Sequence, residues 1–185
     1  MNTKRETVLC SVSHIILNPE LEISFVLELV LMEGEWKPPE WWYRKQRPSS
    51  DEAYFENMTR VIFQAGLNWN VIDKKWQTTR KAFEQFSIGK VACFTDKDVQ
   101  RLLKNEGIVR NRSKVCATIQ NAVEFQAIKK AHGSFQKYLD SLDKSKNYAQ
   151  VVTELTKRFK HMGPSSASLF LYTVGEKIEP WDMPH

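Results

Sequence analysis

The chain has 185 residues, of which 42% are hydrophobic and 26% charged, and these proportions suit one compact domain with a proper core. Its net charge of +5 favours phosphate-bearing partners only slightly. Three widely spaced cysteines, an odd number without a CxxC pair, exclude a disulfide framework and favour a reducing, cytoplasmic setting. The longest apolar stretches, residues 8–17 and 24–32, are too short for a membrane helix, which needs ~18–20 residues. We therefore expect no membrane partner.

The first 31 residues differ from the rest, because they lack the turn signals and motifs that follow. We expect an N-terminal extension of uncertain role over 1–31 and the working domain over 32–185. An early start codon would explain the same boundary, since Met32 opens the Pro/Trp-rich segment EGEWKPPEWWYRKQRP.

Helical periodicity dominates from residue 49 onward. Ser49 and Glu52 have capping-box spacing, and Gly66 is expected to end the first helix. Further helices are predicted over about 70–86, from Thr95, from Ser113, near 135–139, and over about 148–159 and 164–174. No period-2 strand pattern of any weight appears, so the fold class is an all-α helical bundle.

The segment FKHMGPSSA, residues 159–167, is typical of two helices joined by a tight turn. Gly163 permits the reversal and Pro164 suits the first position of a new helix. The free N–H groups of that helix, with the hydroxyls of Ser165 and Ser166, would form an anion pocket. A helix–hairpin–helix element grips DNA backbone in this way, with Met162 in its turn. An ordinary helix corner would give the same pattern.

The segment QAGLNW, residues 64–69, places large apolar side chains in a turn. If Leu67 is exposed, it would act as an apolar wedge that fills a gap in duplex DNA. If Trp69 is exposed, its ring would stack on an extruded base. Gln64 and Asn68 lie in the same turn. The alternative is that the Leu67 and Trp69 side chains both pack into the core, as most such residues do.

The segment GIVRNRSK, residues 107–114, is a basic turn between two helices. Arg110, Arg112 and Lys114 are candidates for phosphate contacts. Equally, one of the two arginines would be a structural clamp that bonds the carbonyl groups at the C-terminal end of a helix.

Taken together, FQAGLNW, GIVRNRSKV and FKHMGPSSA, in this order and spacing, resemble the 3-methyladenine DNA glycosylase I family over about residues 54–174. The resemblance implies a helix–hairpin–helix fold and a monomeric enzyme that flips an alkylated purine out of double-stranded DNA. Such an enzyme hydrolyses the N-glycosidic bond without a cofactor. No lysine is an obvious Schiff-base nucleophile, so we expect a monofunctional glycosylase.

The resemblance also assigns roles to single residues. Trp69 falls on the tryptophan that stacks on the base, and Gln64 and Leu67 fall in the loop that probes the DNA gap. Residues 163–166 fall on the hairpin. Tyr43 and Trp42, with Trp41 beside them, lie near the expected aromatic pocket, although their spacing does not align cleanly.

The sequence departs from the family in three places. Val61 stands where the family has a pocket glutamate, so the reading of the base edge is changed. The family's zinc ligands are represented only by Cys10, His14 and the terminal His185, too few to close a tetrahedral site, so we predict no metal. The chain also ends soon after the hairpin helix.

The C-terminal segment offers one candidate catalytic residue. Asp182 follows Gly163 by 19 residues, the approximate spacing of a catalytic aspartate in the wider superfamily. It would stabilise an oxocarbenium-like sugar or orient water, unless it is a solvated carboxylate near a frayed end. Glu176 and Glu179 are weaker candidates. The sequence leaves two alternatives to base release from alkylated DNA: a non-catalytic DNA-binding protein, or a glycosylase for another lesion.

Overall fold

The computed structural model describes residues 47–179, and this part of the chain contains helices and no strand. The predicted all-α fold class is confirmed. In chain order the helices are α3 (Asp51–Gln64), α4 (Trp69–Ala82), the short 3-10 helix η2 (Glu84–Phe86), α5 (Ile88–Ala92), α6 (Asp96–Lys104), α7 (Arg112–His132), α8 (Phe135–Ser141), α9 (Ser145–Arg158) and α10 (Pro164–Thr173).

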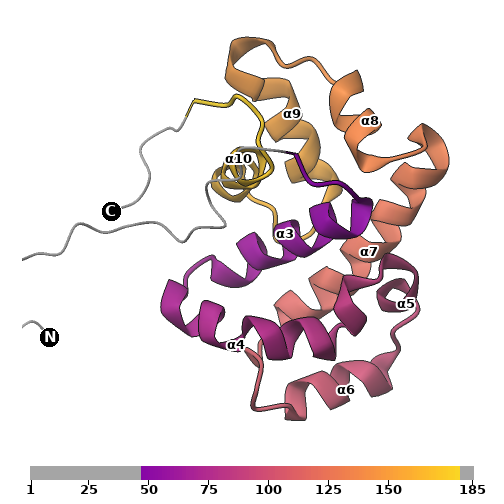
Figure 1. The fold of residues 1–185 in the computed structure, drawn as a ribbon, viewed down its shortest axis with the longest axis vertical. Coiled ribbons are helices and arrows are strands. Elements are labelled where there is room, and N and C mark those ends of the chain that lie inside the picture. The colour runs from indigo at the N-terminus through magenta and orange to yellow at the C-terminus, as the bar shows by residue number, and fades with distance from the viewer. Residues whose placement is uncertain (1–46, 180–185) are drawn as a thin grey trace, which may run out of the picture. The chain divides into compact units, whose positions relative to one another are not determined.

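Helix α7 is the scaffold on which the others are assembled. It has 21 residues and packs against α3, α5, α6 and α8 (Figure 1). Helix α10 in turn packs against α3 and α9, and α4 packs against α3 and η2. Helices from both halves of the chain therefore meet on α3 and α7.

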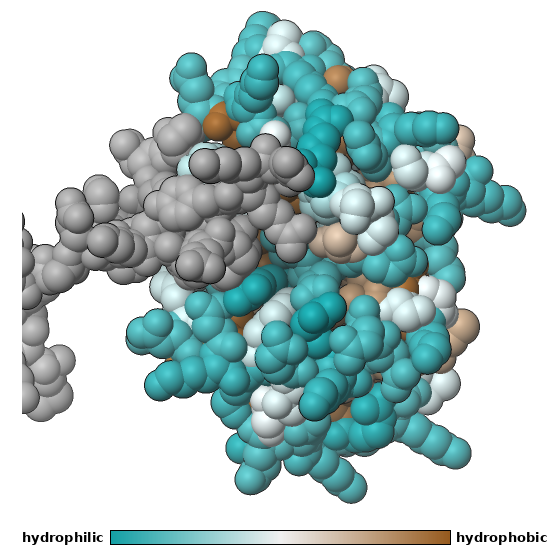
Figure 2. Space-filling model, viewed as in Figure 1, coloured by the Kyte–Doolittle hydropathy of each residue, from teal (hydrophilic) through white to brown (hydrophobic). Residues whose placement is uncertain are grey.

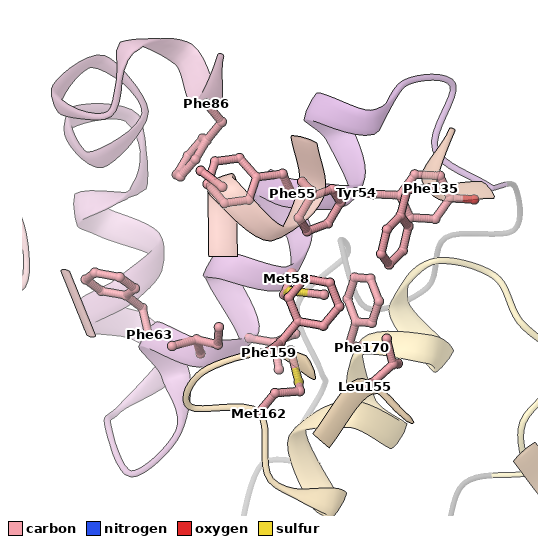
Figure 3. Close-up of a cluster of buried hydrophobic side chains, with 14 of the residues drawn as sticks. Tyr54, Phe55, Met58, Phe63, Phe86, Phe135, Leu155, Phe159, Met162 and Phe170 are labelled. Carbon is pink, nitrogen blue, oxygen red and sulfur yellow. The ribbon is translucent and has the colours of Figure 1, made fainter. Parts of the chain in front are cut away.

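The core between these helices is rich in aromatic rings. Phe125 of α7 and Phe135 of α8 stack with ring centroids 4.5 Å apart, and both also contact Phe159. Figure 3 shows this cluster continuing to Phe170 of α10 and to Met162. Tilted and stacked rings of this kind pack densely, so the core holds the ends of α3, α9 and α10 rigidly.

The helix starts follow local sequence signals. The side-chain oxygens of Asn68, Asn111 and Ser134 each accept a backbone N–H of the helix that follows. Thr95 and Asp98 form a capping box at α6, which confirms the predicted start there. The first helix is capped by Ser50 and not by Ser49 as predicted.

The structure departs from the predicted helices in two places. The helix expected over 70–86 ends at Ala82, because the backbone turns left-handed at Glu84–Phe86, with φ between 53° and 56°. The short helix α5 that follows was not predicted. Val71 of α4 and Val123 of α7 are apolar, yet they are 45% and 50% exposed.

Few large apolar side chains reach the surface. Figure 2 shows a face that is mostly hydrophilic with small apolar patches. Among the described residues, the exposed large hydrophobic side chains are Leu67, Val71 and Val123. Within residues 47–179, no helix is both long enough and apolar enough to span a bilayer.

Candidate nucleic-acid interface

The turn between α3 and α4, residues 64–69, is tight and points outward. The Leu67 N–H donates to the Gln64 carbonyl at 2.9 Å, and Gly66 adopts φ = 74°, a conformation that suits glycine. Asn68 caps α4 through its side chain. Leu67 is 39% exposed, and Val71, one helical turn later, is exposed as well. Two apolar side chains, Leu67 and Val71, are therefore exposed to solvent near the half-buried Trp69.

Lys114 holds this turn from the side. Its Nζ donates to the carbonyl oxygens of Phe63 at 3.0 Å and Ala65 at 2.6 Å, at the C-terminal end of α3. Carbonyl groups at a helix end lack partners within the helix, so a buried ammonium group satisfies them. Burial lowers the pKa of Lys114. Lys114 is thus a carbonyl clamp, a role expected of one of the arginines, and its phosphate contact stays a prediction.

The turn between α9 and α10, residues 159–163, has an apolar inner side and an exposed outer side. Phe159 and Met162 are each 2% exposed and point into the core (Figure 3). Because the Met162 side chain faces the core, the DNA contact predicted at this residue rests on its backbone and stays a prediction. Gly163 caps α10, and Pro164 occupies the first turn as predicted.

Hydrogen bonds join the turn between α9 and α10, which we call the hairpin turn (residues 159–163), to α7. Ser113 Oγ and His161 Nε2 lie 2.6 Å apart, and His161 has left-handed backbone at φ = 55°. About two turns further along α7, the Asn121 side chain accepts the Lys160 N–H at 2.8 Å and donates to the Lys160 carbonyl at 3.1 Å. These bonds hold a non-glycine residue in a costly conformation, so the turn is specified by its contacts with α7.

The three motifs found in the sequence thus meet at one place. The first turn of α7 contacts the 64–69 turn through Lys114 and the hairpin turn through the neighbouring Ser113. Segments separated by about a hundred residues in sequence are held in fixed relation by one short stretch of helix.

The charges around this meeting point favour anions. Arg110 and Arg112 are exposed, and their partners Glu106 and Asp96 lie 3.6 and 4.0 Å away. Exposed ion pairs of this kind contribute little to stability, so both guanidinium groups stay accessible from solvent. Neither α7 nor α10 has an acidic residue in its first turn. Their N–H groups and positive dipole ends are therefore uncompensated by carboxylates at these positions.

The comparisons with known proteins agree with this arrangement. A family model described as methyladenine glycosylase matches residues 39–170, well over half of the chain. The chain belongs to the methyladenine glycosylase family.

DNA-3-methyladenine glycosylase from Haemophilus influenzae is 31% identical over 123 residues, which cover 66% of this chain and 62% of that protein. DNA-3-methyladenine glycosylase 1 from Escherichia coli is 35% identical over 96 residues, or 52% and 47% of the two chains. The chain thus spans less than two thirds of the length of these curated relatives.

Solved structures resemble the fold as well. 3-Methyladenine DNA glycosylase I from Staphylococcus aureus has a TM-score of 0.66 and 27% identity, over 80% of this chain and 92% of that one. A structure of 3-methyladenine DNA glycosylase I in complex with 3-methyladenine gives the same TM-score and identity, over 80% and 93%.

Two residues to which the family resemblance assigns contacts with DNA or the base are buried. Gln64 is 2% exposed, and Val61 is 1% exposed and packs within the hydrophobic core. The contacts expected of these two side chains stay predictions.

Several predicted residues lie outside the described part of the chain. These are Trp41, Trp42, Tyr43, Asp182 and the zinc candidates Cys10, His14 and His185. Among residues 47–179, no group of three or more His, Cys, Asp or Glu side chains is arranged to hold a metal ion. The absence of zinc stays a prediction.

Glu176, a weaker candidate for the catalytic carboxylate, has a different set of contacts. Its buried carboxylate lies 2.7 Å from Arg47 and 3.0 Å from Lys144, and it accepts the Tyr148 hydroxyl at 3.0 Å. Arg47 and Lys144 also pair with Asp140. Burial would raise the pKa of Asp140, but hydrogen bonds from these two cations outweigh it and the pKa is lowered. This network, invisible in the sequence, ties residues 47, 140, 144, 148 and 176 together.

Proposed function

We propose that this chain is a monofunctional DNA glycosylase that removes an alkylated purine, 3-methyladenine or a similar base, from double-stranded DNA. The observation that carries the proposal is the first turn of α7, whose Ser113 and Lys114 contact the hairpin turn and the 64–69 turn. The named relatives are DNA-3-methyladenine glycosylases, and they support the same activity. We propose that the protein acts as a monomer.

The grip on DNA comes from backbone contacts. N–H groups at the start of α10, with the hydroxyls of Ser165 and Ser166, bind one phosphate, and Arg110 and Arg112 bind its neighbours. Contacts of this kind carry no base-sequence information, which suits an enzyme that must search all DNA.

Base extrusion uses the 64–69 turn. Leu67 enters the gap in the duplex from its exposed position, and Trp69 stacks on the extruded base. Hydrolysis then breaks the bond between the sugar C1′ and the base, which leaves with the bonding electron pair, while water supplies a hydroxyl group to C1′ and releases its other proton to solvent. A cationic methylated purine departs as a neutral molecule, so stacking and desolvation contribute much of the catalysis. Asp182 is our candidate for stabilising the positive sugar.

One observation favours a second function. Val61 gives the end of α3 an apolar side chain that packs in the core. A chain that grips DNA but releases no base, a non-catalytic helix–hairpin–helix protein, is consistent with this. A pocket reshaped around another lesion is also consistent with it.

The test compares two exposed apolar residues. Leu67→Ala and Val123→Ala each remove an exposed side chain, so both should change the free energy of unfolding by less than about 0.5 kcal/mol. Only Leu67→Ala should slow release of 3-methyladenine from methylated duplex DNA, because only Leu67 lies in the 64–69 turn. Equal rates for both variants contradict the proposed wedge.

Trp69→Ala tests the stacking plate. We expect the activation free energy of base release to rise by about 1–3 kcal/mol, the usual value of an aromatic–base contact. The melting temperature should change little. A core tryptophan would instead cost about 3–5 kcal/mol of folding free energy. A large fall in melting temperature therefore contradicts the stacking role.

A further inference from the structure

Gln64 has an unusual environment for a buried amide. The residue is 2% exposed, and neither its Nε2 nor its Oε1 has a hydrogen-bond partner. Within residues 47–179 it is the only side chain with two buried polar atoms that lack hydrogen bonds. An unpartnered buried polar group costs about 1–3 kcal/mol, so its presence needs an explanation.

Asn57, on the same helix, shows how a structural amide is satisfied. It is 3% exposed and lies two turns before Gln64 on the same face of α3. Its Oδ1 accepts the Thr173 hydroxyl at 3.0 Å, and its Nδ2 donates to the Thr173 carbonyl at 3.4 Å. The Asn57 amide joins α3 to α10, whereas the Gln64 amide joins nothing.

The backbone around Gln64 is fixed although its side chain is unpartnered. Lys114 binds the carbonyl groups of Phe63 and Ala65, on either side of Gln64. The Gln64 carbonyl accepts the Leu67 N–H. The next four residues, 65–68, are exposed, so the amide lies directly beneath the surface of the turn. Side-chain rotamer changes are common at interfaces when partners bind, and contact between this amide and DNA requires one at Gln64.

We infer that Gln64 reads the edge of the extruded base, an inference that rests on the proposed glycosylase function. A glutamine amide offers one donor and one acceptor side by side. The N6/N7 edge of adenine offers the complementary acceptor and donor, whereas the N7/O6 edge of guanine offers two acceptors. Gln64 therefore selects adenine-type over guanine-type lesions, and the base supplies the hydrogen bonds that the free protein lacks.

The test replaces the amide with an apolar group of similar size. Gln64→Leu should leave the melting temperature unchanged or raise it, because no hydrogen bond is lost. The matched variant Asn57→Leu should lower the melting temperature. With methylated duplex DNA, Gln64→Leu should reduce the ratio of released 3-methyladenine to released 3-methylguanine by roughly 5- to 150-fold, the value of one bidentate pair. Its binding to unmodified duplex should stay at the wild-type level.

Each other outcome overturns the inference. If Gln64→Leu melts as low as Asn57→Leu, or does not fold, the amide is structural. If the variant is stable and keeps the wild-type release ratio, Gln64 does not read the base. If the wild-type protein itself releases no base, the proposed function fails, and the inference fails with it. Wild-type activity therefore separates failure of the function from failure of the inference alone.

Discussion

Removal of the Lys114 ammonium group is the most informative single change to the interface. In Lys114→Met the apolar stem is retained, but the hydrogen bonds to the carbonyls of Phe63 and Ala65 are lost. A hydrogen bond from a charged group contributes about 1.5–3 kcal/mol, and the burial that lowers the pKa of Lys114 offsets part of the gain. We expect a net loss of about 2–3 kcal/mol, which at about 2–4 °C per kcal/mol lowers the melting temperature by about 4–12 °C.

Lys114→Met should also slow base release, beyond what its loss of stability explains. Without the clamp, the end of α3 is free to shift and Leu67 no longer meets the gap in the duplex. At a temperature where the variant is fully folded, base release should fall, while binding to unmodified duplex should persist through the hairpin turn and Arg112. Lys130→Met, an exposed lysine on the same helix, is the matched control and should change neither property. If Lys114→Met instead lowers the salt sensitivity of duplex binding, as loss of a phosphate contact would, or leaves base release intact, Lys114 does not position the turn.

Three further predictions concern packing, DNA affinity and the buried ion cluster. Gly107→Ala should cost about 1–3 kcal/mol of folding free energy, because a Cβ at Gly107 would lie 2.5 Å from Thr78 Cγ2. Gly89→Ala, where nothing lies within 4 Å, should not be destabilising, and equal melting temperatures for the two variants would refute the clash. Arg112→Ala should reduce the slope of log K against log salt for duplex binding by about 0.9, the value for one phosphate contact; an unchanged slope excludes that contact. Glu176→Gln should lower the free energy of unfolding, measured with denaturant, by about 3 kcal/mol. Removing one partner of a buried ion pair costs about 3–5 kcal/mol, and the cations that pair with Glu176 are partly exposed. Wild-type stability of this variant would show that the ion cluster is dispensable.

Features coded by neighbouring residues could be predicted from the sequence, and features that depend on distant contacts could not. The Thr95 cap, the end of the first helix before Gly66 and the start of α10 at Pro164 are local signals, and all were confirmed. The break after Ala82 was missed because periodicity continues through it, although the backbone turns left-handed at Glu84–Phe86.

The candidate site divides in the same way. The motifs were recognisable from their residues, but which side chains face outward depends on helices far away in sequence. From the sequence alone Lys114 is predicted to bind phosphate, but in the structure it lies against the end of α3. Gln64 is predicted to lie at the surface, but it is buried. The contact between Ser113 and His161 joins positions 48 residues apart. No local pattern in the sequence reports such a contact.

Release of an alkylated purine from DNA is the activity that most directly tests the proposed function. Purified protein is incubated with duplex DNA treated with a methylating agent, and the bases set free are separated by chromatography. We expect 3-methyladenine to accumulate with time and in proportion to protein, and the rate to fall in Trp69→Ala. If the DNA is saturated with protein but yields no free base, the protein binds DNA without glycosylase activity and the proposed function is wrong.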